Sequence, residues 1–140
     1  MLIKDEKIMK KKILLVQPEV PEYRYAFFSK LNDKFNIAFV HSGKKWDSQK
    51  PTKQIIAPLR TFFKIFYYQK FNIFAEVSKS EIVVINGNIR YLSNLLIILI
   101  ALILNKKLVW WGHLQSADGS LFFKIIRLRL AKLANFRLFY

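Results

Sequence analysis

Short apolar runs separated by polar segments recur along the whole chain. The runs are rich in Ile, Val, Leu and Phe, and this continuous apolar character is typical of strands that are buried on both faces of a sheet. The predicted strands are residues 11–18, 36–43, 54–59, 81–86, 106–112 and 136–140.

Longer segments between these strands have helical spacing. In residues 23–35 one helical face is expected to carry the apolar positions Ala26, Phe27, Leu31 and Phe35. Residues 60–80 are aromatic-rich and are predicted to be helical, at least from Tyr67 onward. Residues 87–105 are predicted to form a turn and then an almost wholly apolar helix.

Residues 120–135 are predicted to form the last helix, with two different faces. The expected inner face consists of Phe122, Phe123, Ile126, Leu130, Leu133 and Ala134. The expected outer face carries Lys124, Arg127, Arg129 and Lys132, with Leu121, Ile125 and Leu128 among them. Apolar residues within a basic face indicate either a helix on a membrane surface or a helix buried under another part of a protein.

Alternation of strands and helices predicts the α/β class, with a Rossmann-like, doubly wound parallel sheet and right-handed crossovers. Residues 1–11 are interpreted as a basic N-terminal extension, and residues 12–140 as the Rossmann-like domain. Because the chain ends within an apparent strand, at residues 136–140, we expect this domain to be incomplete.

The composition limits the partners and the chemistry that can be expected of this chain. With 24 Lys and Arg against 9 Asp and Glu, the net charge is +15, which favours polyanionic partners such as phosphorylated substrates, acidic membrane surfaces or nucleic acid. The absence of Cys excludes disulfides and thiolate chemistry and fits a reducing compartment. With only two His, no metal site is expected. The longest apolar run, residues 95–104, is about half of the ~20 residues that cross a bilayer, so we expect a buried core helix.

Ligands of open α/β sheets bind beyond the carboxyl ends of the strands. The first of these loops has no G-x-G-x-x-G motif, so we predict no dinucleotide cofactor. Arg24, at the start of the next helix, can meet an anionic ligand or form a salt bridge. Asn86 or Asn88 can cap the helix after the fourth strand. Arg90 then falls in its first turn, where a cation opposes the helix dipole, and this indicates a role in ligand binding.

His113 follows directly on Trp111 and Gly112. Gly112 allows a close approach of backbone or ligand. A His at a strand end can act as a general base near neutral pH, or it can be a loop residue bonded to backbone. Asp118 can orient His113 or cap the following helix. Nothing in the sequence around His41, near another strand end, supports a role for it.

Three motifs occur in order at these strand ends: P-x-Y-R-x-x-F-F at residues 21–28, N-x-R at 88–90 and W-G-H at 111–113. Together they resemble the N-terminal half of glycosyltransferase family 4 (group 1) enzymes, which have the GT-B fold. The resemblance runs from about residue 12 to residue 140 and is weakest across 42–69. The glycine-rich first loop of many family members is absent here.

The resemblance implies a retaining, metal-independent enzyme that transfers a hexosyl group from a nucleotide sugar to a surface-glycan or lipid-linked acceptor. It implies a catalytic role for His113. The expected acceptor-binding residues are Tyr23, Arg24, Asn88, Arg90 and Asp118. The nucleotide sugar is a co-substrate rather than a cofactor, and its binding domain is missing from the sequence, so we expect no transfer by this chain alone. The implied location is the cytoplasm, peripherally on the inner face of the cell membrane, where an anionic membrane surface is a further expected partner.

A non-catalytic basic module that binds an anionic membrane or nucleic acid is the alternative. Aromatic residues interleaved with basic ones can bind single strands. Here most aromatic residues fall where a core is expected and no nucleic-acid motif is present, which disfavours nucleic acid.

Overall fold

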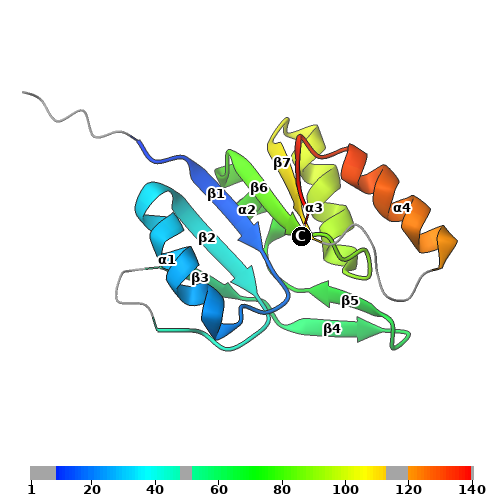
Figure 1. Ribbon diagram of the computed structural model, residues 1–140, viewed down its shortest axis with the longest axis horizontal. Coiled ribbons are helices and arrows are strands. Elements are labelled where there is room, and N and C mark those ends of the chain that lie inside the picture. The colour runs from blue at the N-terminus through cyan, green and yellow to red at the C-terminus, as the bar shows by residue number, and fades with distance from the viewer. Residues whose placement is uncertain (1–8, 48–51, 113–119, 140) are drawn as a thin grey trace, which may run out of the picture.

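The computed structural model describes residues 9–47, 52–112 and 120–139, and its centre is a six-stranded, all-parallel sheet (Figure 1). The strand order is β3-β2-β1-β6-β7-β8, as in doubly wound Rossmann-like folds. The strands are β1 (Lys12–Val16), β2 (Asn36–His41), β3 (Lys53–Ile56), β6 (Ile82–Asn86), β7 (Lys107–Trp111) and β8 (Phe136–Leu138). The predicted α/β class, the Rossmann-like sheet and all six predicted strands are confirmed.

Helices cover both faces of the sheet (Figure 1). One face packs against α1 (Tyr25–Lys34), which follows a short 3-10 helix, η1 (Glu22–Arg24). The other face packs against α2 (Ile73–Lys79), α3 (Leu92–Ile103) and α4 (Leu121–Lys132). Within the described residues no helix is both long and apolar enough to cross a membrane.

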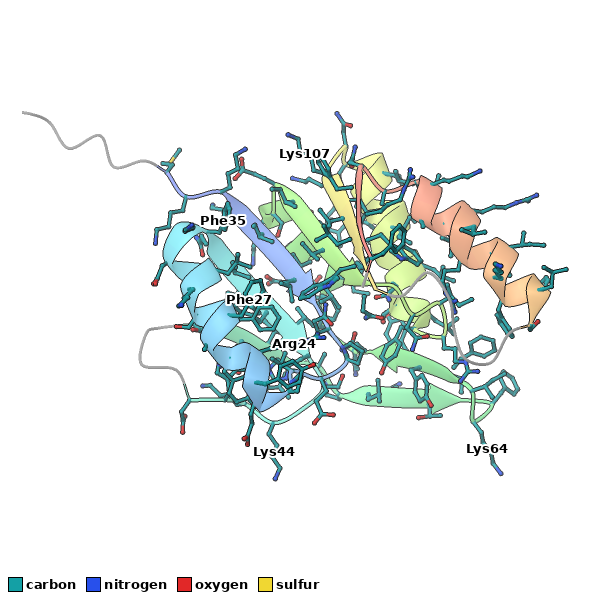
Figure 2. The ribbon with its side chains drawn as sticks, viewed as in Figure 1. Arg24, Phe27, Phe35, Lys44, Lys64 and Lys107 are labelled. Carbon is teal, nitrogen blue, oxygen red and sulfur yellow. The ribbon has the colours of Figure 1, made fainter. Side chains whose placement is uncertain are left out.

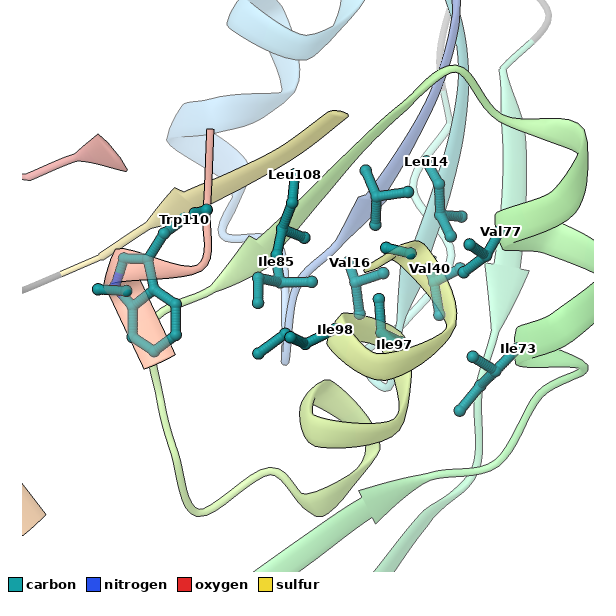
Figure 3. Close-up of a cluster of buried hydrophobic side chains, with 14 of the residues drawn as sticks. Leu14, Val16, Val40, Ile73, Val77, Ile85, Ile97, Ile98, Leu108 and Trp110 are labelled. Carbon is teal, nitrogen blue, oxygen red and sulfur yellow. The ribbon is translucent and has the colours of Figure 1, made fainter. Parts of the chain in front are cut away.

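The core is divided between these two faces because side chains alternate along each strand. Leu14 and Val16 of β1 point into the larger cluster, under α2 and α3 (Figure 3). Ile13 and Leu15 point into the smaller cluster, where Phe28 of α1 is buried. Each fully buried Leu, Ile or Phe stabilises the fold by about 1.5–3 kcal/mol, so the continuous apolar strands supply most of the driving force for this architecture.

The prediction of a helix from Tyr67 onward is wrong at its start. Residues 59–69 form an antiparallel hairpin, with strands β4 (Leu59–Phe62) and β5 (Phe66–Gln69). Aromatic and β-branched residues favour strands, and β5 gains backbone partners because the Tyr67 N–H donates to the Arg90 carbonyl at 2.8 Å. The helix α2 begins only at Ile73, where the Asn72 side chain caps it by accepting from the Ala75 N–H at 3.1 Å.

Helix faces also differ from the predicted ones. In α1 the buried residue is Phe28, whereas Ala26 and Phe27 are exposed, because Phe28 packs against Phe39 of β2 and Trp111 of β7. In α4 the expected inner face is confirmed for Phe123, Ile126 and Leu130, which pack against the larger core cluster. It is wrong for Phe122 and Leu133, which are exposed, and Arg127 of the expected outer face is buried. The small Ala131 and Ala134 lie against the sheet there, and this sets the rotation of the helix.

The apolar helix α3 is only half buried. Its inner side, with Ile97, Ile98 and Ala101, joins the larger core cluster. Its outer side exposes Leu95, Leu96, Leu99, Leu102 and Ile103. The expected buried core helix is therefore confirmed for the inner side of α3 and wrong for this outer stripe.

Candidate functional site

The sheet has a topological switch point between β1 and β6. From β1 the chain proceeds through α1 to β2 on one side, and from β6 it proceeds through α3 to β7 on the other. The loops that follow these two adjacent strands therefore leave toward opposite faces of the sheet. In open α/β sheets ligands bind at this place, beyond the carboxyl ends of the strands.

Arg24 links two of the three sequence motifs. Its guanidinium carbon lies 5.3 Å from the centre of the Trp111 ring and 5.4 Å from that of Tyr23. A guanidinium over an aromatic face is attracted by the ring quadrupole, by about 0.5–1 kcal/mol at exposed sites and more when desolvated. The first motif is thus held against the end of β7, one residue before Gly112. Tyr23 itself is 75 % exposed, so most of its side chain is accessible.

The N-x-R motif forms a tight turn after β6. The side-chain oxygen of Asn86 accepts from the Asn88 N–H at 3.1 Å, and that of Asn88 accepts from the Arg90 N–H at 3.0 Å. Neither Asn caps α3, because that helix begins at Leu92 after Tyr91 and has no side-chain cap. The capping prediction is therefore wrong. Arg90 is exposed and lies before the helix rather than in its first turn, so the predicted conflict with the helix dipole does not arise.

Two glycines bring the ends of β6 and β7 into close contact. A Cβ on Gly112 would lie 2.9 Å from the Cα of Gly87, and a Cβ on Gly87 would lie 2.7 Å from Nε1 of Trp110. The Gly87 N–H donates to the Trp111 carbonyl at 2.8 Å. Gly112 therefore allows the backbones at the ends of β6 and β7 to approach each other closely. The second and third motifs are neighbours at this carboxyl edge of the sheet.

Glu19 is a carboxylate at the switch point that sequence reasoning did not single out. Its side chain lies beside Gly43 at the end of β2. Burial raises the pKa of Tyr91, and the nearby Tyr67 and the negative charge of Glu19 raise it further. Glu19 lies in the loop after β1 and Tyr91 in the loop after β6, so the charge of Glu19 acts from one loop of the switch point on the other. Its place after the first strand was the signal available in the sequence.

His41 is fully buried at the end of β2. Its Nε2 lies 3.3 Å from Oε1 of Gln54, which also accepts from the Trp46 N–H. Nε2 is therefore the protonated nitrogen. Burial lowers the pKa of His41, and the hydrogen bond to Gln54 and the charge of Glu19 oppose this shift. His41 is thus a neutral, buried imidazole that packs on Trp46, and we assign it a structural rather than a catalytic role.

Buried amides line the base of this edge. Gln69, at the end of β5, is fully buried, and its Nε2 donates to the Gln17 carbonyl at 2.8 Å and to Ser42 Oγ at 3.1 Å. Among the described residues, Nε2 of Gln17 and Nδ2 of Asn86 have no hydrogen-bond partner.

The two remaining predicted site residues, His113 and Asp118, lie outside the described residues. Of the others, Arg24 contacts Trp111 in the segment that leads into His113, and Tyr23 lies next to Arg24. Asn88 and Arg90 lie in the neighbouring loop after β6. Trp111 is the central contact of this arrangement, and the sequence reasoning used it only as part of a motif. Its separation from Arg24 along the chain hides their contact from any local pattern.

A groove of about 710 Å³ lies at the opposite, amino edge of the sheet. Its lining includes Lys10, Lys12 and Lys53, beside Asn32 and Phe35. None of the predicted site residues contributes to it. Across the described part of the chain, no group of three Asp, Glu or His side chains is arranged to hold a metal ion.

The sequence matches no known protein-family model, and no curated protein matches it either. Function is therefore inferred from the motifs and from their geometry at the carboxyl edge of the sheet.

Proposed function

We propose that this chain is the acceptor-binding domain of a GT-B glycosyltransferase similar to family 4. The single observation that carries the proposal is the contact of Arg24 with Trp111. This contact joins the first and third motifs of the family resemblance at the switch point of the sheet. The second motif lies beside the third through the Gly87–Gly112 contact.

The residues at this edge suit an acceptor that carries both hydroxyl groups and a phosphate. Arg24 and Arg90 supply positive charge, which pairs well with phosphate oxygens. The exposed ring of Tyr23 offers a stacking face, and Asn88 offers an amide. In the proposal these groups hold a surface-glycan or lipid-linked acceptor, with Glu19 and Trp111 completing the binding surface.

The proposed reaction is transfer of a hexosyl group from a nucleotide sugar with retention of configuration. His113 follows Gly112 and is proposed to face acceptor and donor, as the resemblance implies. The donor is proposed to bind to a second domain of the GT-B type. The proposal assigns the protein to the cytoplasm, peripherally at the inner face of the cell membrane.

Acceptor binding can be tested without the donor domain. The full chain is titrated with short-chain prenyl diphosphate-linked monosaccharides, and binding is followed by saturation-transfer NMR. Arg24→Ala should weaken binding about tenfold, because a charge-assisted hydrogen bond contributes about 1.5–3 kcal/mol. Lys34→Ala, at the far end of α1, removes one positive charge as well and should leave binding unchanged.

The donor arm of the same experiment uses UDP- and GDP-sugars. The proposal expects weaker binding of these molecules than of the acceptors, and no sugar transfer by the chain alone. Robust turnover, or binding of nucleotide sugars in preference to every acceptor, would contradict it.

A further inference from the structure

The β4–β5 hairpin ends in an exposed aromatic tip. Phe63 is 89 % exposed. Phe63 and Lys64 both have positive φ, 49° and 58°, and the Ile65 N–H donates to the Phe62 carbonyl at 3.2 Å. Such a turn favours Asn and Gly at its two central positions, and a bulky aromatic residue there is costly. The stability of the turn therefore does not explain why Phe63 occupies this position.

The start of α4 presents a second exposed apolar cluster. Leu121 and Phe122 are 70 % and 66 % exposed. α4 follows β7 and so begins at the carboxyl edge of the sheet. The hairpin lies at the same edge, because the Gln69 N–H donates to Ser93 Oγ at 3.3 Å and β5 packs along the start of α3 (Figure 1). The hairpin tip and the start of α4 thus expose apolar side chains at the carboxyl edge of the sheet, as do Leu95 and Leu96 near the start of α3.

Basic residues lie beside these apolar side chains, and the hairpin, α3 and α4 contain no Asp or Glu. Arg60 and Lys64 are exposed on the hairpin, and Lys124 on the first turn of α4. Figure 2 shows Lys64 projecting away from the sheet. Residues 48–75, 82–117 and 119–140 contain no Asp or Glu. The surface is therefore apolar and cationic together.

We propose that this surface, formed by the hairpin tip and the start of α4, docks on an anionic membrane. Phe63, Leu121 and Phe122 enter the lipid interface, and Arg60, Lys64 and Lys124 face the headgroups. Apolar side chains framed by Lys and Arg are typical of interfacial binding. Lys is depleted from protein–protein interfaces, which argues against a protein occupant. Proteins that bind single-stranded nucleic acid use a basic groove in which bases stack on aromatic side chains. A projecting hairpin tip is not such a groove, which argues against nucleic acid.

The inference rests on the membrane location in the proposed function and adds the surface that docks there, which is argued from exposed side chains and can fail independently of sugar transfer. It would place the switch point close to the membrane, because α3 and α4 both begin at the carboxyl edge. A lipid-linked ligand would then reach that edge from the bilayer.

Co-sedimentation of the full chain with vesicles tests the proposal. Vesicles of phosphatidylcholine are compared with vesicles that also contain phosphatidylglycerol, and neither contains a saccharide. The wild type should bind only the anionic vesicles, and binding should weaken as salt rises. Phe63→Asn should lower the partition coefficient about tenfold, as expected for the loss of one buried aromatic side chain.

The same substitution separates docking from folding. Asn is favoured at positive φ, so the Tm of Phe63→Asn should be equal to or above that of the wild type. Leu121→Ser is a second variant on the other cluster and should also weaken vesicle binding. Phe27→Asn is the matched control, because Phe27 is 53 % exposed on α1, over the opposite face of the sheet. It should bind vesicles like the wild type.

Three outcomes would overturn the proposal. The first is equal binding to both kinds of vesicle, or wild-type binding by Phe63→Asn. The second is binding of a single-stranded oligonucleotide that Phe63→Asn abolishes while vesicle binding is absent. The third is a dimer that the same substitution dissociates, which would assign the surface to a second copy of the chain.

Discussion

Replacing Gly112 with Ala tests the close contact between the ends of β6 and β7. The added Cβ would lie 2.9 Å from both Cα and N of Gly87, and real Cβ atoms do not approach backbone that closely. Both atoms belong to the main chain, so one strand end must move away from the other. Gly112 does not have positive φ, so the effect is steric rather than conformational.

The expected magnitude follows from two opposing contributions. Overpacking costs about 1–3 kcal/mol, and Gly→Ala stabilises by about 0.4–1 kcal/mol because the unfolded chain loses freedom. We expect Gly112→Ala to lower the free energy of unfolding by about 1–2 kcal/mol, measured by urea denaturation with tryptophan fluorescence. Ligand binding at the switch point should weaken in the same variant, because Trp111 precedes the displaced residue.

Gly43→Ala is the control for this experiment. Its Cβ would lie even closer to a neighbour, 2.8 Å, but that neighbour is Cγ of the exposed Glu19 side chain. A flexible side chain can rotate away at little cost, so stability should stay within about 0.5 kcal/mol of the wild type. Equal destabilisation by both substitutions, or none by Gly112→Ala, would refute the contact.

Two further predictions concern buried polar groups. Because burial lowers the pKa of His41 in the folded state, the unfolded state binds more protons as pH falls below about 6.5. Stability should therefore be present in full above that pH and fall below it, by at most about 1.4 kcal/mol per unit. Urea unfolding between pH 7.5 and 5.5 should show a shallower pH dependence for His41→Gln than for the wild type, and equal slopes would contradict the assignment. Gln69→Leu removes the donor to the Gln17 carbonyl and to Ser42 Oγ, and should cost about 1–3 kcal/mol in the same assay. Lys70→Leu, at the exposed neighbouring position, should be nearly neutral, and an equal loss there would refute the role of the buried amide.

The sheet could be predicted from the sequence because its signal is local. Each central strand is a short continuous apolar run, as in Ile13–Val16 and Ile82–Ile85, which is typical of a strand buried on both faces. The hairpin was missed although aromatic residues favour strands, because its turn carries Phe63 and Lys64 in place of the Asn and Gly that mark a two-residue hairpin turn. What decides between them is the pairing of Tyr67 with the loop before α3, and that contact is long-range.

The positions of four predicted site residues at strand ends could be read from the sequence, but their contacts could not, and their role in a site stays a prediction. The strand-end rule and the motifs selected Tyr23, Arg24, Asn88 and Arg90. The rule could not show that Asn88 shapes its own turn, because Asn serves caps and turns equally well. The strand-end rule also covers the position of Glu19, but the contacts of Glu19 with Gly43 and of Trp111 with Arg24 join distant parts of the chain, and no local pattern encodes those contacts.

Chemical-shift mapping on the full chain tests the central claim most directly. The probe is a short-chain prenyl diphosphate-linked monosaccharide, and the indole N–H of Trp111 is the main reporter. The account predicts shifts concentrated at residues 19–24, 88–90 and 111, next to the Arg24–Trp111 contact. Shifts concentrated at the amino-edge groove, around Lys10 and Lys53, or no shifts with any acceptor, would contradict an acceptor site at the switch point.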